Sequence, residues 1–259
     1  MQNRFIVSPF FIDKELPPLE HFAPPDWHLN KPPFDKQDRL SRMSTINDGI
    51  AQFVASTCNH GERPVSIAGD CCTAIGVLAG LQRAGIHPQL LWLDAHGDFN
   101  TDETSPSGFI GGMPLAMIVG RGDQTLVQAA GLTPLPEANV ILADARDLDP
   151  EESKAVKTSG VRHVTTVEAL QSQITTAALY VHLDADVIDP RDAPAMLYPT
   201  PHGPSLAQLR VAVQALAQNR NIVAVSMTVW DFAQDADKKT EHACMQLLHD
   251  LIGDLRQLQ

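Results

Sequence analysis

Basic residues are scarce in this sequence of 259 residues: 19 lysines and arginines stand against 31 aspartates and glutamates, for a formal net charge of −12. A chain this acidic is repelled by nucleic-acid phosphates and by anionic membrane surfaces, so we expect neither as a partner. The charge is compatible with a cationic or zwitterionic small molecule as substrate.

Long apolar runs and a disulfide framework are missing as well. No stretch approaches the roughly 20 apolar residues that span a bilayer, and the N-terminus has no basic region followed by an apolar one. The four cysteines are too few and too scattered for a disulfide framework. There is no internal repeat, no glycine-rich phosphate cradle and no Gly-x-Ser-x-Gly motif. We therefore expect a soluble, cytoplasmic protein without a membrane partner, folded as a single domain over residues 1–259.

The chain alternates between two kinds of segment. Short β-branched or apolar runs predict strands at residues 4–8, 64–69, 89–94, 139–144, 162–167, 178–184 and 221–227. Helical spacing is clearest at residues 72–85, 205–219 and 238–257. Near-continuous apolar strands separated by helices indicate an α/β fold with a parallel sheet covered on both faces. The six prolines of residues 10–35 predict an irregular loop, a lid or an oligomer contact, and the fold assignment rests least on residues 1–58.

Acidic side chains gather where two of the predicted strands end. Asp94, His96 and Asp98 are spaced at alternate positions, and so are Asp184 and Asp186. In an extended segment this spacing points the side chains the same way. Ligands of open parallel sheets bind beyond the carboxyl ends of the strands, so the two clusters are candidates for one site.

Converging carboxylates repel one another unless a cation neutralises them. Oxygen-rich ligation with one imidazole suits Mn²⁺ better than it suits Zn²⁺ held by thiolates. Two ions roughly 3.5–4 Å apart would lower the pKa of a bridging water and make hydroxide at neutral pH. The alternative for each cluster alone is ordinary helix capping or a turn, but two clusters at two strand ends favour the metal interpretation.

Five motifs then give the chain a family resemblance: DAHGDFNT at 94–101, GGMP at 111–114, ADARDLDPEE at 143–152, HLDADVIDP at 182–190 and TPHGPSL at 200–206. With them the chain resembles the ureohydrolase superfamily of arginase, agmatinase and formimidoylglutamase. The resemblance implies a three-layer α/β/α sandwich around a mostly parallel sheet of about eight strands. It also implies hydrolysis of a guanidinium or amidine C–N bond by hydroxide bridging two Mn²⁺ ions, in a homo-oligomer (a trimer or hexamer).

The resemblance also implies a ligand set, with Asp94 and Asp184 bridging the ions. The six implied metal ligands are Cys71, Asp94, His96, Asp98, Asp184 and Asp186, of which Asp98 is also a candidate catalytic residue. Cys71, in AGDCC at 68–72, stands where the family carries a histidine. A thiolate is softer and could favour Zn²⁺ or Fe²⁺; alternatively, Cys71 is a small buried hydrophobe beside a depleted site. This cysteine makes the chain resemble the hydroxyarginine hydrolase of D-cycloserine biosynthesis.

Two further departures concern the substrate. Gly111 aligns with a histidine that is proposed to shuttle protons in arginases, so another group must protonate the leaving amine; His202 is a candidate. Val229 aligns with a glutamate that pairs with the guanidinium, and Asp231 could replace it only after a register shift of two. A substrate with a less basic leaving nitrogen, or one that is not a guanidine, would tolerate these changes.

The amino-acid end of the arginase pocket is better matched. Asn100, Ser107 and Asp149 align with positions that hold the carboxylate and amino groups of the substrate, and Glu152 aligns with a nearby acid. The alternative for these residues is an ordinary turn and helix start. The resulting hypothesis is a hydrolase of a guanidino, hydroxyguanidino or amidine group on an amino-acid-like molecule. The alternatives are a non-guanidine C–N substrate on the same metal centre and a catalytically silent homologue.

Overall fold

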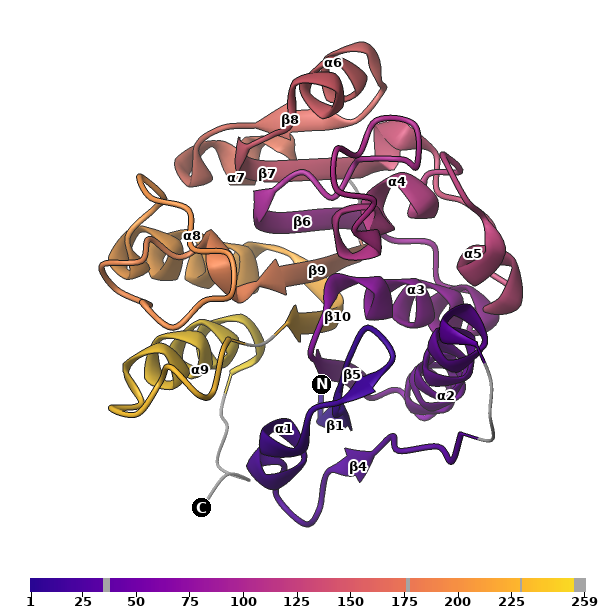
Figure 1. Cartoon of the computed structure of the whole chain (residues 1–259). Coiled ribbons are helices and arrows are strands. Elements are labelled where there is room, and N and C mark those ends of the chain that lie inside the picture. The colour runs from indigo at the N-terminus through magenta and orange to yellow at the C-terminus, as the bar shows by residue number, and fades with distance from the viewer. Residues whose placement is uncertain (35–37, 176–177, 229, 254–259) are drawn as a thin grey trace.

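An eight-stranded sheet lies at the centre of the computed structural model, which describes residues 1–34, 38–175, 178–228 and 230–253 (Figure 1). The strands are β1 (Asn3–Ser8), β2 (Phe10–Phe11), β3 (Lys14–Glu15), β4 (His28–Leu29), β5 (Arg63–Ala68), β6 (Gln89–His96), β7 (Val140–Asp147), β8 (Arg162–Val164), β9 (Ala178–Asp184) and β10 (Asn221–Thr228). The sheet order is β4-β1-β5-β10-β9-β6-β7-β8, and its neighbouring strands pair in parallel. Strands β2 and β3 form a separate antiparallel hairpin.

Helices cover both faces of the sheet, so the predicted three-layer α/β/α sandwich is confirmed (Figure 1). They are α1 (Pro17–Phe22), α2 (Arg39–Asn59), α3 (Ala74–Arg83), α4 (Pro114–Ile118), α5 (Thr125–Ala129), α6 (Pro150–Thr158), α7 (Leu170–Gln173), α8 (Leu206–Asn219) and α9 (Lys239–Ile252). One apolar cluster joins the sheet to α8 and α9, and a second joins its other face to α2, α3 and α4. Within the described ranges, none of the helices is long and apolar enough to span a bilayer.

All seven predicted strands are present, and the proline-rich segment adds the edge strand β4. That segment is also more regular than predicted, because it contains the β2–β3 hairpin and α1. Helix α2 was not predicted, although its buried side chains Met43, Ile46, Ile50 and Val54 follow helical spacing. The last predicted helix, 238–257, is seen as α9, and residues 254–257 lie outside the described residues.

The parallel pairing brings the carboxyl ends of β5, β6, β9 and β10 to one edge of the sheet. Short 3-10 turns follow two of these ends, η1 (Cys71–Thr73) after β5 and η5 (Ala185–Val187) after β9. The chain therefore delivers its acidic and sulfur-bearing side chains to the same edge from segments more than 100 residues apart.

Candidate metal centre

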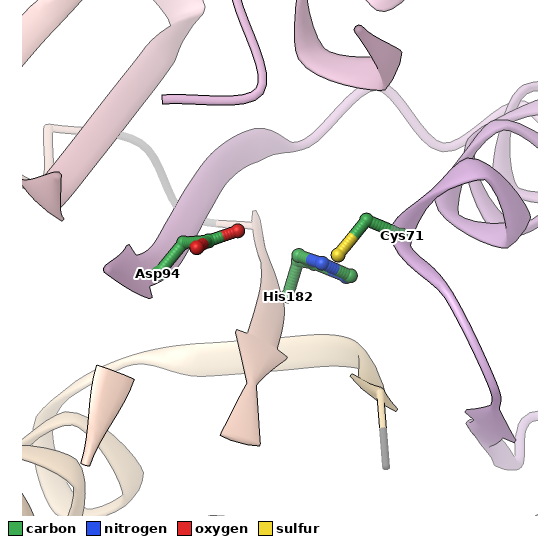
Figure 2. Close-up of side chains that lie close together, drawn as sticks. All are labelled: Cys71, Asp94 and His182. Atoms are coloured by element: carbon green, nitrogen blue, oxygen red, sulfur yellow. The ribbon is translucent and has the colours of Figure 1, made fainter. Parts of the chain in front are cut away.

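The six predicted metal ligands line one cavity of about 290 Å³ at this edge of the sheet. Two groups of side chains present atoms that all lie within 4.8 Å of one another: Cys71, Asp94 and His182, and Asp94, His96 and Asp186. The first group is drawn in Figure 2, where the three side chains come from η1, β6 and β9. Asp94 belongs to both groups, which is the arrangement that a carboxylate bridging two ions requires.

Strand β6 fixes Asp94 from two directions. The buried indole Nε1 of Trp92 donates to Asp94 Oδ2 at 3.0 Å, and the backbone N–H of His96 donates to Oδ1 at 2.7 Å. The chain then turns through Asp98, whose φ of 49° lies in the left-handed region. Oδ2 of Asp98 is buried and has no hydrogen-bond partner among the described residues. A buried acceptor left unpaired is costly, so this atom marks a place for a cation or a proton.

Asp184 is fixed at the end of β9. Its carboxylate caps η5 by accepting from the backbone N–H of Asp186 at 2.9 Å, and the Thr228 hydroxyl on β10 donates to Oδ2 at 2.6 Å. The Cys71 thiol donates to the same oxygen at 2.9 Å. Burial, followed by the nearby charge of Asp184, raises the pKa of the Cys71 thiol well above its ordinary value. A cation that bound here would displace the thiol proton and take its place.

Asp70 places Cys71 at the cavity. The Asp70 carboxylate accepts from the backbone N–H of Cys72 at 3.0 Å and from that of Ile12 at 2.6 Å. The β2–β3 hairpin is thereby held against the turn after β5. Gly69 is required at this contact, because a Cβ there would lie 2.1 Å from the Phe10 carbonyl oxygen. The N-terminal segment therefore forms part of the wall of the site.

The electrostatics of the cluster favour a bound cation. Burial raises the pKa of Asp94, Asp98 and Asp186, and nearby carboxylates raise it further. Burial by itself would lower the pKa of His96, but its contacts with Asp186, at 3.0 Å, and Asp94 outweigh burial and raise it to about 12. A site that charges a histidine so strongly has excess negative charge, and oxygen-rich donors with an imidazole fit divalent metal ions.

We expect an unusual pH dependence for the metal-free protein. Burial, with the charge of Asp186, raises the pKa of Asp184 to about 6, so the folded chain holds a proton that the unfolded chain has already released. Asp184 therefore destabilises the fold as the pH rises through 6, and acidification from pH 7 to pH 5 should recover about 1 kcal/mol at this group.

This contribution is measured as a difference, because burial also lowers the pKa of His182 to about 3 and that group acts in the opposite sense. Chemical denaturation of chelator-treated wild type and Asp184→Asn at both pH values isolates it. The wild type should gain more stability on acidification than the variant, and an equal response would contradict the prediction. Metal-loaded protein should instead lose stability, because protons compete with the ions.

Arg146 is a structural residue of the site that the sequence analysis did not single out. It follows a bulge in β7 at Asp144 and Ala145, both of which have positive φ. Its guanidinium pairs with the Asp144 carboxylate and donates to four carbonyls. Two belong to η5, those of Asp186 at 3.1 Å and Val187 at 3.1 Å, and two to the loop beyond it, those of Thr200 at 2.7 Å and Pro201 at 3.3 Å. This clamp fixes the loop that carries the second ligand cluster. The three charged residues of DARD at 144–147 were visible in the sequence, but the direction of their side chains was not.

The predicted substrate-binding residues differ in how free their side chains are. Asn100, Ser107, Asp149 and Glu152 all line the cavity. Asn100 Nδ2 donates to the Asp149 carboxylate at 3.0 Å. The two oxygens of Glu152 accept from the backbone N–H groups of Phe99, at 2.8 Å, and Asp149, at 3.1 Å. Glu152 therefore supports the loop that follows Asp98 and the start of α6.

Two candidate residues lie outside the cavity lining among the described residues. His202 is exposed in a left-handed turn, with φ of 68°. Asp231 accepts from the Ala233 backbone at 2.9 Å and from Gln234 at 2.6 Å, within its own turn. Val229 lies outside the described residues. The roles suggested for His202 and Asp231 stay predictions, and the structure gives them no contact with the metal ligands.

An aromatic rim surrounds the mouth of the cavity. Phe11 and Phe109 have ring centroids 6.3 Å apart, and Phe109 and Tyr198 have theirs 5.9 Å apart. Gly111 also lines the cavity, and a Cβ at this position would lie 2.4 Å from the Phe109 ring. The Phe109 ring therefore occupies the space into which a side chain at residue 111 would project. This part of the cavity wall is apolar as a result.

Comparisons with known proteins identify the family. The arginase family model matches residues 26–253. The arginase of Bacillus subtilis (strain 168) is 31% identical over 244 residues, which cover 88% of this chain and 82% of that protein. The crystal structure of arginase from Bacillus cereus has a TM-score of 0.86 and 25% sequence identity, with 98% of this chain and 99% of that chain covered.

A more distant likeness shows the fold alone. The crystal structure of formimidoylglutamase from Bacillus subtilis subsp. subtilis str. 168 has a TM-score of 0.69 at 15% identity, with 97% of this chain and 86% of that chain covered. The finer resemblance to the hydroxyarginine hydrolase stays a prediction. From its motifs, its sheet and these relatives, the chain belongs to the arginase family of the ureohydrolase superfamily.

Proposed function

We propose that the protein is a metal-dependent hydrolase of a C–N bond in a guanidino, hydroxyguanidino or amidine group of an amino-acid-like substrate. One observation carries the proposal: six candidate ligands from three segments meet at the floor of one cavity, and Asp94 belongs to two ligand groups. The relatives named arginase support the reaction class. Two Mn²⁺ ions per chain are the expected cofactor.

The side chains have separable roles in this reaction. Asp94 and Asp184 would contribute to holding both ions, Asp98 to one, and His96 and Asp186 to the other. Two divalent ions bound here would lower the pKa of a bound water and so supply hydroxide at neutral pH. Asp98 Oδ2, buried and unpaired among the described residues, would be placed to hold the proton that such a water gives up.

The polar side chains of the upper wall orient the substrate. Asn100, Ser107 and Asp149 line the same cavity as the predicted metal ligands and offer donors and acceptors to an α-amino acid head group. A substrate held there directs its other end towards the ligand cluster. Simple amines that lack the carboxylate, such as agmatine, would lose this orientation and therefore react more slowly.

Phe109 favours a substrate whose leaving nitrogen needs little help. The ring fills the space beside Gly111, where a proton donor would otherwise stand. General acid catalysis is worth about 10²–10⁴-fold in rate, so its absence penalises a strongly basic leaving amine. The same observation supports the second candidate function, hydrolysis of a non-guanidine C–N bond on the same metal centre.

A substrate comparison tests the proposal. Mn²⁺-loaded protein is assayed with L-arginine, Nδ-hydroxy-L-arginine, N-formimidoyl-L-glutamate and agmatine, and the released amine or ammonia is measured. We expect the Nδ-hydroxy compound to exceed L-arginine by at least about tenfold in kcat, because its leaving nitrogen is less basic. Agmatine should be the poorest guanidine. If none of the compounds is turned over at full metal loading, the protein would instead be a catalytically silent homologue.

The assembly is proposed on resemblance. We expect a homo-oligomer, a trimer or hexamer, in the cytoplasm. A light-scattering mass of three or six times 28.2 kDa would agree with this expectation, and a mass of 28.2 kDa would contradict it.

A further inference from the structure

We propose that His182 is a metal ligand, so that the ion assigned to Asp94, Asp98 and Asp184 would also bind the thiolate of Cys71 and the imidazole of His182. The inference rests on the proposed metal centre and deepens it. His182 lies two residues before Asp184 on β9, inside the strand.

The Nε2 atom of His182 is buried and unpaired among the described residues. The residue as a whole has no solvent exposure. Ligand atoms of His182, Cys71 and Asp94 lie within 4.8 Å of one another (Figure 2). Bonds of about 2.0–2.3 Å from one ion to nitrogen, sulfur and oxygen require separations of this size. A bound ion would satisfy the otherwise unpaired nitrogen.

The other ring nitrogen of His182, Nδ1, already has a hydrogen-bond partner. His182 Nδ1 lies 2.7 Å from Ser226 Oγ on β10, and the Tyr180 hydroxyl lies 2.6 Å from the same Ser226 oxygen. With Nδ1–H donating to Ser226, the neutral ring directs the Nε2 lone pair away from this pair. Metal-ligating histidines typically have their second nitrogen held in this way, which sets tautomer and orientation.

The Trp92 side chain contacts two of the three side chains of this ligand group, His182 and Asp94. The Trp92 ring lies 3.8 Å from the His182 ring between centroids, at an interplanar angle of 31°, and its Nε1 donates to Asp94. All of these side chains are buried, so their rotamers are set by packing. A preformed ligand set binds metal without the entropy of ordering its members.

The donor atoms predict different metal preferences for the two sites. The set of Cys71, His182 and Asp94 is softer than the set of Asp94, His96 and Asp186, which contains one imidazole and carboxylates. Thiolate and imidazole together suit Zn²⁺ and related ions, whereas carboxylate-rich sites suit Mn²⁺. We therefore infer that the two sites differ in affinity and in metal selectivity. The site with the softer donor atoms lies at the ends of β5 and β9.

The test uses ¹¹³Cd²⁺-loaded full-length protein with ¹⁵N-labelled histidine rings. We expect one-bond cadmium–nitrogen coupling to two histidines, His96 and His182. His182→Gln should remove one coupling and weaken one of the two ions by at least about tenfold in chelator competition. His163→Gln is the matched control, because this histidine on β8 is outside both candidate ligand groups and its Nε2 lies 2.8 Å from the Asp144 carbonyl oxygen, so both readouts should stay unchanged.

The possible outcomes distinguish a failure of the proposed role of His182 from a failure of the proposed function. Coupling to His96 alone, with unchanged affinities in His182→Gln, would overturn the role of His182 and leave the proposed function standing. Absence of cadmium binding and of any coupling would overturn both. If His182→Gln fails to fold, the wild-type spectrum still decides between one and two coupled histidines, and His96→Gln assigns the remaining signal.

Discussion

Asp94→Asn is expected to lower kcat/KM by at least about a thousandfold, or about 4 kcal/mol of transition-state stabilisation. Asp94 is the only side chain common to both ligand groups found among the described residues. Asparagine keeps the size of the side chain but removes the charge that two cations share. It also changes the acceptor of the Trp92 indole N–H. Both ions should therefore bind more weakly, in contrast to a variant of a residue that serves only one of them.

The measurement combines metal content with steady-state kinetics. Asp102→Asn is the matched control, since this exposed aspartate lies in the loop that follows the same strand. The control should retain wild-type metal content and activity. If Asp94→Asn kept two tightly bound ions and full activity, the shared-carboxylate arrangement would be wrong and the proposed function would lose its central support.

Arg146→Met is expected to destabilise the fold by about 3–5 kcal/mol, because it leaves a buried carboxylate without its partner. The side chains of Arg146 and Asp144 are 12% and 8% exposed, so solvent screens their pairing little. The guanidinium also donates to the carbonyl oxygens of Asp186 and Thr200. Removing it should loosen the loop that carries Asp186 and so weaken metal binding as well. Denaturant unfolding and metal competition measure the two effects.

Two comparison variants make this prediction specific. Arg191→Met removes an arginine of the same loop that is 81% exposed and pairs with Asp189, so solvent screens this charge and the variant should be much less destabilised than Arg146→Met. The double variant Asp144→Asn with Arg146→Met removes both buried charges and should be less destabilised than Arg146→Met alone. Equal effects of Arg146→Met and Arg191→Met would show that the clamp contributes little.

The N-terminal segment has a larger part in the site than its proline content indicated. Asp70 joins the hairpin to the turn that bears Cys71, and Phe11 lines the cavity. A lid or an oligomer contact was the expectation for residues 10–35. The structure builds the hairpin into the wall of the cavity, and β1 and β4 extend the sheet on that side. The lid and the oligomer contact stay predictions.

The sequence by itself determined the class of fold and the position of the acidic clusters. Both depend on short-range patterns: apolar runs predict buried strands, and alternate spacing at a strand end directs side chains to one face. Asp94, His96 and Asp98 could therefore be placed together before their partners were known. The three-layer sandwich followed from the alternation of strands and helices, and from the family motifs.

Only the tertiary structure decided which distant groups complete the site. The direction of Arg146 depends on a bulge between β6 and β7, and its acceptors lie up to 55 residues away. His182 Nε2 has no hydrogen-bond partner among the described residues, whereas Nδ1 of the same ring pairs with Ser226, 44 residues later in the chain. Phe109 closes the space beside Gly111 because the loop folds back on itself. Such contacts are set by strand register and packing, which no local pattern of residues encodes.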